Sequence, residues 1–277
     1  MDMKGSIAAI KDAITKSTAE RTSPEVISAA YAVVYLIGGV LLASARLLGA
    51  AGPFGMAAVA ASGAGLNGVA ALIGAAIGYI ISCGLAGSIR YLAAIVLVYT
   101  ICFAFQDTKL ASKSVFAPAT AAVSALSTGI LSSFTSVFTQ APAAAVVLIE
   151  TVFSFGGCWF FREAMSGRER TTESEELRYA GSVLITAAVL LMAVSQIEIF
   201  GAISLGRLVA VLIVMTCTLR CGIMTGCTIG TAFGIAMDLT AGGMPFYTMA
   251  YAFAGLLSGM FNRHGRLLFL LSFIIAN

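Results

Sequence analysis

The stretch PFGMAAVAASGAGLNGVAALIGAAIGYIISC, residues 53–83, decides the fold of this chain. It carries no charged side chain, yet it is too long for one ordinary membrane-spanning helix and short for two. Gly63, Gly65 and Gly68 interrupt it near the middle, which favours a division into two helices. The way this stretch divides sets the orientation of every helix that follows it.

The composition of the whole chain predicts lipid as its main solvent. Hydrophobic residues make up 59% of the 277 residues and charged residues only 10%. Charge is concentrated in residues 1–28 and 162–178, whereas a water-soluble protein of this size needs charge over its whole surface. The apolar runs are too long and smooth for a β-barrel's alternation, so we predict an all-α, polytopic transmembrane helical bundle.

We predict about ten spans, at residues 29–48, 53–63, 66–83, 89–106, 115–138, 141–161, 180–199, 204–219, 221–239 and 245–261. Six of them fall in residues 29–161 and four in 180–261, and residues 162–178 form the loop between the two groups. Residues 267–277 read as the start of an apolar run that is cut short, so we interpret the chain as a fragment of a longer protein.

Basic residues fix the predicted orientation. If the N-terminus is cytoplasmic and residues 53–83 cross twice, 13 of the 16 Lys and Arg residues lie inside, and Arg46, Arg90 and Arg207 lie outside. A single crossing would leave only six inside. We therefore predict that residues 1–28 and 162–178 are both cytoplasmic, and that Arg46 and Arg90 extend toward the membrane interface.

Small residues predict where helices approach one another closely. A glycine recurs every four residues along one predicted helix, at Gly222, Gly226, Gly230 and Gly234. Glycines at this spacing let a neighbouring helix approach backbone to backbone, which favours association in lipid. We interpret the four as a helix-packing ridge; a groove along which a solute moves is the alternative.

Two Pro-Phe turns punctuate the chain. In each, glycines permit a tight turn, the proline begins the next helix and the aromatic ring can anchor at the interface. Their residues are Gly52, Pro53 and Phe54 in the first turn, and Gly243, Pro245 and Phe246 in the second.

One carboxylate is predicted deep in the membrane, at Glu150 in the middle of the span 141–161. Such a group is a functional candidate by default, but no second intramembrane carboxylate forms a relay with it. We expect a neutral, structural carboxyl group that hydrogen-bonds a neighbouring helix. The sequence has no Walker, Gly-x-Ser-x-Gly or His-Glu-x-x-His motif, so we expect no catalytic site, no metal site and no cofactor in this chain.

The segments RCGIMTGCTIGTAFGIAMDL, residues 220–239, and GGMPFYTMAYAFAGLLSGMF, residues 242–261, resemble the membrane domain of the stage II sporulation protein E family. The earlier ARLLGAAGPFGM, residues 45–56, looks like that family's first inter-span turn. The likeness covers roughly residues 30–277, and the glycine ridge followed by Gly-Gly-x-Pro-Phe-Tyr is its most specific part.

This resemblance implies a membrane anchor for a cytoplasmic protein serine/threonine phosphatase of the 2C type, which uses Mn or Mg. Family members sit at the polar septum of an endospore-forming bacterium, interact with division proteins and switch on the forespore sigma factor. The chain ends before a phosphatase domain, so none of that domain's metal-binding residues carries over. A single further span after residue 261 would place such a domain outside, which is in tension with ten preceding spans.

We therefore expect a non-catalytic anchoring and septal localisation domain, with the lipid bilayer, septum proteins and a second copy of itself as partners and no nucleic acid. The alternative is a small-solute or ion transporter with broken helices. A membrane-embedded enzyme is disfavoured because the catalytic motifs are missing. A transporter should hold Glu150 in a wet cavity, and an anchor should be a closed bundle.

Overall fold

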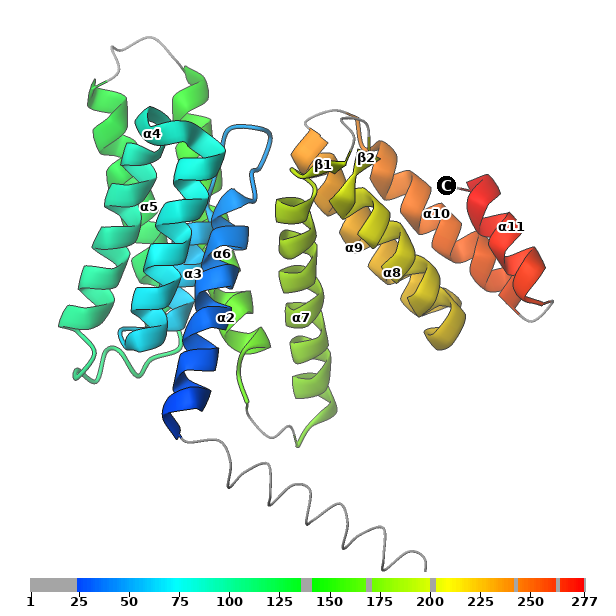
Figure 1. The fold of residues 1–277 in the computed structure, drawn as a ribbon, viewed down its shortest axis with the longest axis horizontal. Coiled ribbons are helices and arrows are strands. Elements are labelled where there is room, and N and C mark those ends of the chain that lie inside the picture. Colours follow the sequence, from blue (N-terminus) through cyan, green and yellow to red (C-terminus); the bar gives the residue numbers. More distant parts are fainter. Residues whose placement is uncertain are drawn as a thin grey trace, which may run out of the picture.

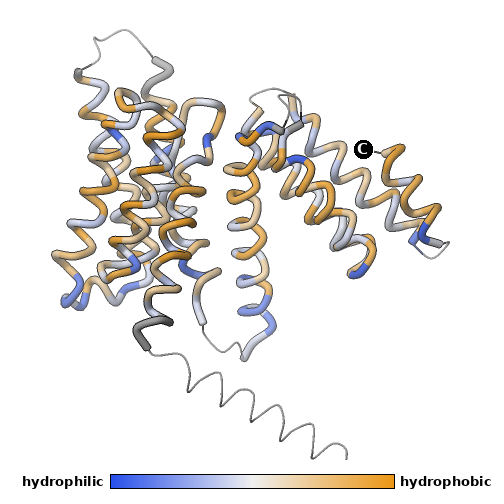
Figure 2. Tube along the Cα trace, viewed as in Figure 1, coloured by the Kyte–Doolittle hydropathy of each residue, from blue (hydrophilic) through white to orange (hydrophobic). Residues whose placement is uncertain are grey.

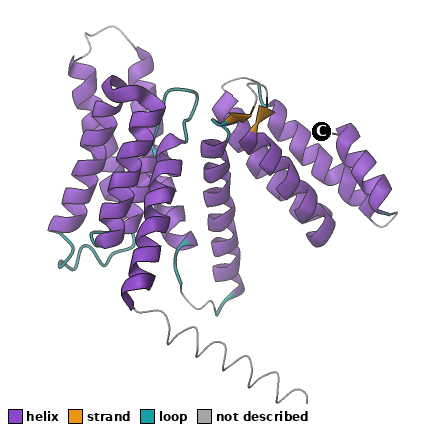
Figure 3. Ribbon diagram, in the orientation of Figure 1, coloured by secondary structure: helices purple, strands orange, loops and turns teal. Residues whose placement is uncertain are grey.

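The computed structural model describes residues 24–135, 141–167, 171–199, 203–241, 244–262 and 265–276. The predicted cytoplasmic segment 1–28 lies almost wholly outside these ranges. The described chain consists of helices, the loops between them and one short β-hairpin, drawn in orange in Figure 3. Its elements are α2 (Pro24–Ser44), α3 (Phe54–Ser62), α4 (Leu66–Ala104), α5 (Phe116–Thr135), α6 (Ala141–Ala164), α7 (Glu173–Val194), β1 (Glu198–Ile199), β2 (Ile203–Ser204), α8 (Leu205–Cys221), α9 (Ile223–Ala241), α10 (Phe246–Phe261) and α11 (Arg266–Ala276).

The helices form two lobes, with α2–α6 in one and α8–α11 in the other, and α7 stands between them (Figure 1). Hydrophobic residues cover the bodies of the helices, and many of the hydrophilic residues collect near their ends (Figure 2). Among the described residues, four helices are long and apolar enough to cross a bilayer: Leu66–Ala104, Ala144–Ala164, Glu173–Val194 and Ile223–Ala241. The structure is therefore that of a helical membrane protein, while ten crossings remain a prediction.

Helix α4 is a hairpin rather than one long rod. Gly84 has φ 68° and ψ 169°, which breaks the helix into arms at residues 66–83 and 85–104. The rings of Tyr79 and Tyr91 stack with centroids 4.7 Å apart, although twelve residues of straight helix would separate them by about 18 Å. The second arm therefore runs back along the first, close to where the sequence predicts the end of one span and the start of the next.

Helix α3 corrects the predicted span 53–63. Its nine residues extend only about 14 Å, less than half of a hydrocarbon core of about 30 Å. Residues 45–53, which lead into α3, are not helical, and an isolated β-bridge joins Leu47 to Ala51. Much of this segment is buried. The turn around Pro53 thus begins a short helix inside the bundle instead of a full-length span.

The loop predicted at residues 162–178 is shorter in the structure, because α6 continues to Ala164 and α7 already begins at Glu173. Arg178 pairs with Glu163 at 3.0 Å and joins the facing ends of these two helices. Arg162 donates a hydrogen bond to the Ser114 carbonyl at 3.1 Å, so the segment 105–115 lies at the same end of the bundle. This juxtaposition agrees with the basic-residue distribution, which assigns both loops to one side.

Three of the four predicted ridge glycines pack closely. A Cβ atom at Gly226, Gly230 or Gly234 would collide with α8 or α10, so these positions admit only glycine without a shift of the neighbour. Gly222 does not belong to the ridge: it has φ +90°, a Cβ there would meet open space, and it makes the turn between α8 and α9. The ridge therefore runs along α9 from Gly226 onward.

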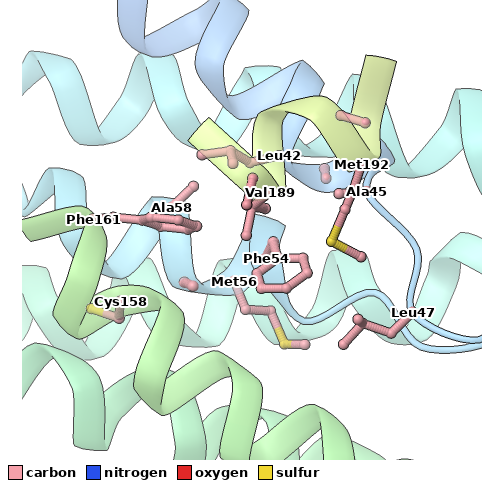
Figure 4. Close-up of a cluster of buried hydrophobic side chains, with 14 of the residues drawn as sticks. Leu42, Ala45, Leu47, Phe54, Met56, Ala58, Cys158, Phe161, Val189 and Met192 are labelled. Carbon is pink, nitrogen blue, oxygen red and sulfur yellow. The ribbon is translucent and has the colours of Figure 1, made fainter. Parts of the chain in front are cut away.

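The lobes meet through apolar side chains and one backbone contact. Leu42 of α2, Phe54 of α3 and Phe161 of α6 gather around Val189 and Met192 of α7 (Figure 4). In addition, the Leu48 N–H donates a hydrogen bond to the Leu239 carbonyl at 2.8 Å. The segment before the first Pro-Phe turn thus touches the end of the helix that leads to the second.

Candidate functional site

Glu150 lies in the interior of the first lobe, and the structure gives it a charged partner. It sits about 14 Å along α6 from the first residue of that helix, and its side chain is 1% exposed. The guanidinium Nη2 of Arg90, in the second arm of α4, lies 2.7 Å from Glu150 Oε1. The sequence predicts a hydrogen bond from this carboxyl group to a neighbouring helix but does not identify a basic partner, and Arg90 turns inward with only 22% of its side chain exposed.

Three donors converge on the same oxygen of this carboxylate. Besides Arg90, the Tyr91 hydroxyl lies 2.6 Å from Oε1, and the Gly52 backbone N–H donates to it at 3.3 Å. Tyr91 also lies 3.1 Å from the Ala50 carbonyl, but its single proton goes to the nearer carboxylate. Charge-assisted hydrogen bonds of this kind are stronger than neutral ones, so Glu150 ties α4 and α6 to the segment before α3.

The non-helical segment 45–53 needs these side chains because lipid offers its backbone no hydrogen-bond partner. Tyr79, fully buried in the first arm of α4, accepts a hydrogen bond from the Met56 N–H at 3.2 Å and donates one to the Gly52 carbonyl. Ser154 donates to the Pro53 carbonyl at 3.2 Å. These groups satisfy backbone atoms at the beginning of α3, where no residue of α3 itself provides a side-chain cap.

Glycine is required where the Tyr79 ring crosses this turn. A Cβ atom on Gly55 would lie 2.6 Å from the Tyr79 ring carbon Cζ, and one on Gly52 would lie 3.1 Å from its Cε1. The stacked rings of Tyr79 and Tyr91 therefore form a wall against which the Gly52-Pro53-Phe54-Gly55 turn lies. The first Pro-Phe turn is thus part of the buried polar site, and Phe54 makes an edge-on contact with Phe153 of α6 at 6.2 Å.

The second Pro-Phe turn is built differently. Asp238 of α9 accepts hydrogen bonds from the backbone N–H groups of Tyr247 and Thr248, at 2.9 Å and 2.8 Å, and so caps the beginning of α10. Pro245 precedes the helix, Phe246 is 64% exposed, and Gly243 lies outside the described residues. This turn presents an aromatic ring at the surface, while Phe54 of the first turn is buried.

The arrangement around Glu150 holds helices together and leaves little room for a ligand. The N-terminus of a helix is a common anion-binding site. Near the start of α3, however, the Gly52 backbone N–H already donates a hydrogen bond to the Glu150 carboxylate. Oε2 of Glu150 is buried and has no hydrogen-bond partner among the described residues. The described residues contain no group of three or more His, Cys, Asp or Glu that could hold a metal ion.

The sequence places Glu150 in the interior but does not identify Arg90, Tyr79 or Tyr91 as its neighbours. The positive-inside rule counts basic residues on each side of the membrane and takes no account of ion pairs with distant acidic residues, so it predicts Arg90 at the outer interface. Two features of the sequence favour this ion pair: Glu150 is the one carboxylate predicted deep in the membrane, and Arg90 is the one basic residue among the apolar residues 85–104. Opposite charges in neighbouring apolar spans commonly pair.

Comparison of the sequence with protein-family models and with curated proteins, and of the fold with solved structures, gives no match.

Proposed function

We propose that this chain is a membrane-anchoring domain, a closed helical bundle that holds a position in the bilayer. The observation that carries this proposal is the packing around Glu150. With 1% of its side chain exposed, the carboxylate meets no water-filled cavity, and its charge is balanced within the protein by Arg90. A transporter that used this group would need solvent or solute to reach it.

The more specific proposal is that the domain belongs to a protein of the stage II sporulation protein E type. It rests on the motifs in residues 220–261, where the close-packed glycines Gly226, Gly230 and Gly234 precede the Pro-Phe turn. In that setting the domain would carry a 2C-type phosphatase with Mn or Mg on the cytoplasmic side. It would concentrate at the polar septum through division proteins and through contacts with its own copies.

One observation favours a transporter as the second candidate. Helix α3 is a half-length helix entered through buried non-helical chain, and broken helices of this kind line substrate sites in secondary transporters. In a transporter, the backbone at the start of such a helix faces the solute. Here Glu150 and Tyr79 already bind the backbone N–H groups of Gly52 and Met56, which is why we place anchoring first.

A fluorescent fusion of the chain, expressed in a sporulating endospore-former, separates these proposals. We expect fluorescence to concentrate at the polar septum, and even labelling of the whole membrane would contradict septal localisation. Purified protein in proteoliposomes should give no ion flux above empty vesicles under a pH or sodium gradient. Flux that disappears in the Glu150→Gln variant, with the protein still folded, would favour transport.

A further inference from the structure

A polar pocket lies at the end of the first lobe, where α6 finishes and α5 begins. Each of the six side chains that line it carries a hydrogen-bonding group: Ser112, Ser114, Trp159, Arg162, Glu163 and Ser166. The loops at 105–115 and 162–178 meet at this end, which the basic-residue distribution assigns to the cytoplasmic side. We propose that the pocket binds the headgroup phosphate of an anionic phospholipid from the adjacent leaflet.

The pocket lies at the level of α6 where lipid headgroups are expected. The segment Ala144–Ala164 is long and apolar enough to cross a bilayer, and Arg162 and Glu163 lie in its last turn. Trp159 is the only tryptophan in the sequence, and tryptophan favours the boundary between membrane and water. These three side chains are spaced three and four residues apart, so α6 presents them on one face. A phospholipid phosphate is therefore the anion that a membrane supplies at this depth.

Arg162 provides the hydrogen-bond donors that a phosphate needs. Its Nη1 donates to the Ser114 carbonyl at 3.1 Å, while its Nε and Nη2 groups make no hydrogen bond to another described residue. A guanidinium group presents its N–H groups as a planar fork that matches two oxygens of a phosphate. The hydroxyl protons of Ser112 and Ser166 go to backbone carbonyls instead. The arginine, rather than the serines, is therefore the main anchor for the ligand.

The charges around the pocket favour an anion over a cation. Glu163 is the one acidic residue that lines it, and its Oε1 accepts hydrogen bonds from Nε and Nη2 of Arg178, at 3.2 Å and 3.0 Å. That pair is neutral overall, which leaves in excess the positive charges of Arg162 and of the loop 105–115, with its two lysines and one aspartate. The positive end of α5 and the negative end of α6 meet here, so the helix dipoles oppose each other and the side chains decide the sign. Basic pockets between helices at the cytoplasmic face suit anionic headgroups.

The test uses the fluorescence of Trp159, which lines the pocket and has no second tryptophan to obscure it. The whole chain, purified in a non-ionic detergent, is titrated with dioctanoyl phosphatidylglycerol. Dioctanoyl phosphatidylethanolamine, dioctanoylglycerol without a phosphate, and inorganic phosphate are titrated in parallel. We expect a saturable change in emission at the lowest concentration with phosphatidylglycerol and none with dioctanoylglycerol. Added salt should move the midpoint to higher lipid concentration.

Charge-removing substitutions distinguish a phosphate site from a structural contact. Arg162→Gln should raise the midpoint by about tenfold, as the loss of a charge-assisted hydrogen bond would. Glu163→Gln should lower the midpoint, because it removes a negative charge beside the phosphate. Arg220→Gln is the matched control: Arg220 lies in the last turn of α8 and does not line the pocket, so the midpoint should equal that of the wild type.

Four outcomes would overturn the proposal. An equal change in emission with dioctanoylglycerol would show that Trp159 reports acyl chains, and this comparison needs no variant to fold. Equal midpoints for phosphatidylethanolamine and phosphatidylglycerol would contradict selection of an anionic lipid, and saturation by inorganic phosphate at the same concentration would assign the pocket to free phosphate. A midpoint that rises in Glu163→Gln, or stays unchanged in a folded Arg162→Gln protein, would contradict the charge argument. All of these are independent of septal localisation, which the fluorescent fusion tests separately.

Discussion

Arg90 and Glu150 form an ion pair, with 2.7 Å between Nη2 and Oε1, although sixty residues separate them in the sequence. The two side chains bring together the second arm of α4, the middle of α6 and the segment that leads into α3. Glu150 is almost completely buried while Arg90 keeps 22% of its side chain exposed. The pair is therefore asymmetric, and losing the arginine should harm the protein more than losing the carboxylate.

Replacing Arg90 with Met should destabilise the domain by about 3 kcal/mol, the low end of the range for breaking a buried pair, because Glu150 loses its positively charged partner and keeps only the hydrogen bonds from Tyr91 and Gly52. The loss should appear as a lower unfolding temperature of the purified protein in mild detergent, followed by size-exclusion chromatography after heating. Glu150→Gln leaves the partly exposed Arg90 unpaired and should cost less.

The double variant Arg90→Met, Glu150→Gln is the control that isolates the charge. It removes both charges, so its loss of stability should be smaller than the sum of the two single losses, by a coupling of about 0.5–3 kcal/mol. If the two single losses simply add, the pair does not contribute through its charges and the neutral carboxyl group expected from the sequence would be the better description.

Replacing Tyr79 with Phe should also destabilise the domain, since the hydroxyl satisfies both the Met56 N–H and the Gly52 carbonyl. We expect a loss of about 1–3 kcal/mol, the cost of leaving buried backbone groups without partners. Tyr99→Phe is the matched control, because its hydroxyl makes one part-buried hydrogen bond, to the Ala64 carbonyl. Equal melting temperatures for the two variants would contradict a capping role for Tyr79.

Sequence patterns locate most of the helices, and the reason is physical. Apolar runs separated by glycine, proline and charged residues mark where backbone must be satisfied internally, so the predicted spans 66–83 and 89–106 lie close to the two arms of α4. The pattern does not reveal that α3 is a half-length helix, because apolar residues around Pro53 suit both a full span and a chain buried by its neighbours.

The contacts of the buried site are harder to predict because they join distant segments. The partner of Glu150 depends on how α4 folds back at Gly84, which sets Arg90 and Tyr91 facing α6. Glycine spacing is also ambiguous: Gly222 matches the four-residue repeat but serves as a turn, since its positive φ ends α8. Spacing along a helix says nothing of where that helix begins.

Replacing Gly230 with Ala should separate α9 from α10, because a Cβ there would collide with the Tyr251 carbonyl, which is backbone and cannot move away alone. We expect a loss of about 1–3 kcal/mol, as for other overpacked contacts. Gly38→Ala, where a Cβ meets open space, should be neutral or slightly stabilising because alanine favours helix. An unchanged melting temperature for Gly230→Ala would mean that α10 is not held against α9 as described.

Ser174 and Met244 should lie on opposite sides of the membrane, with Ser174 cytoplasmic. Ser174 begins α7 beside the basic loop, and Met244, which is 88% exposed, lies in the turn between α9 and α10, three crossings later if α7, α8 and α9 each span. Single cysteines at the two positions, in a background without the six native cysteines, would be treated in intact cells with a membrane-impermeant maleimide. We expect labelling of Met244→Cys and protection of Ser174→Cys until the cells are permeabilised. Labelling of Ser174→Cys alone would reverse the orientation inferred from the basic residues, and labelling of both would contradict their placement on opposite sides.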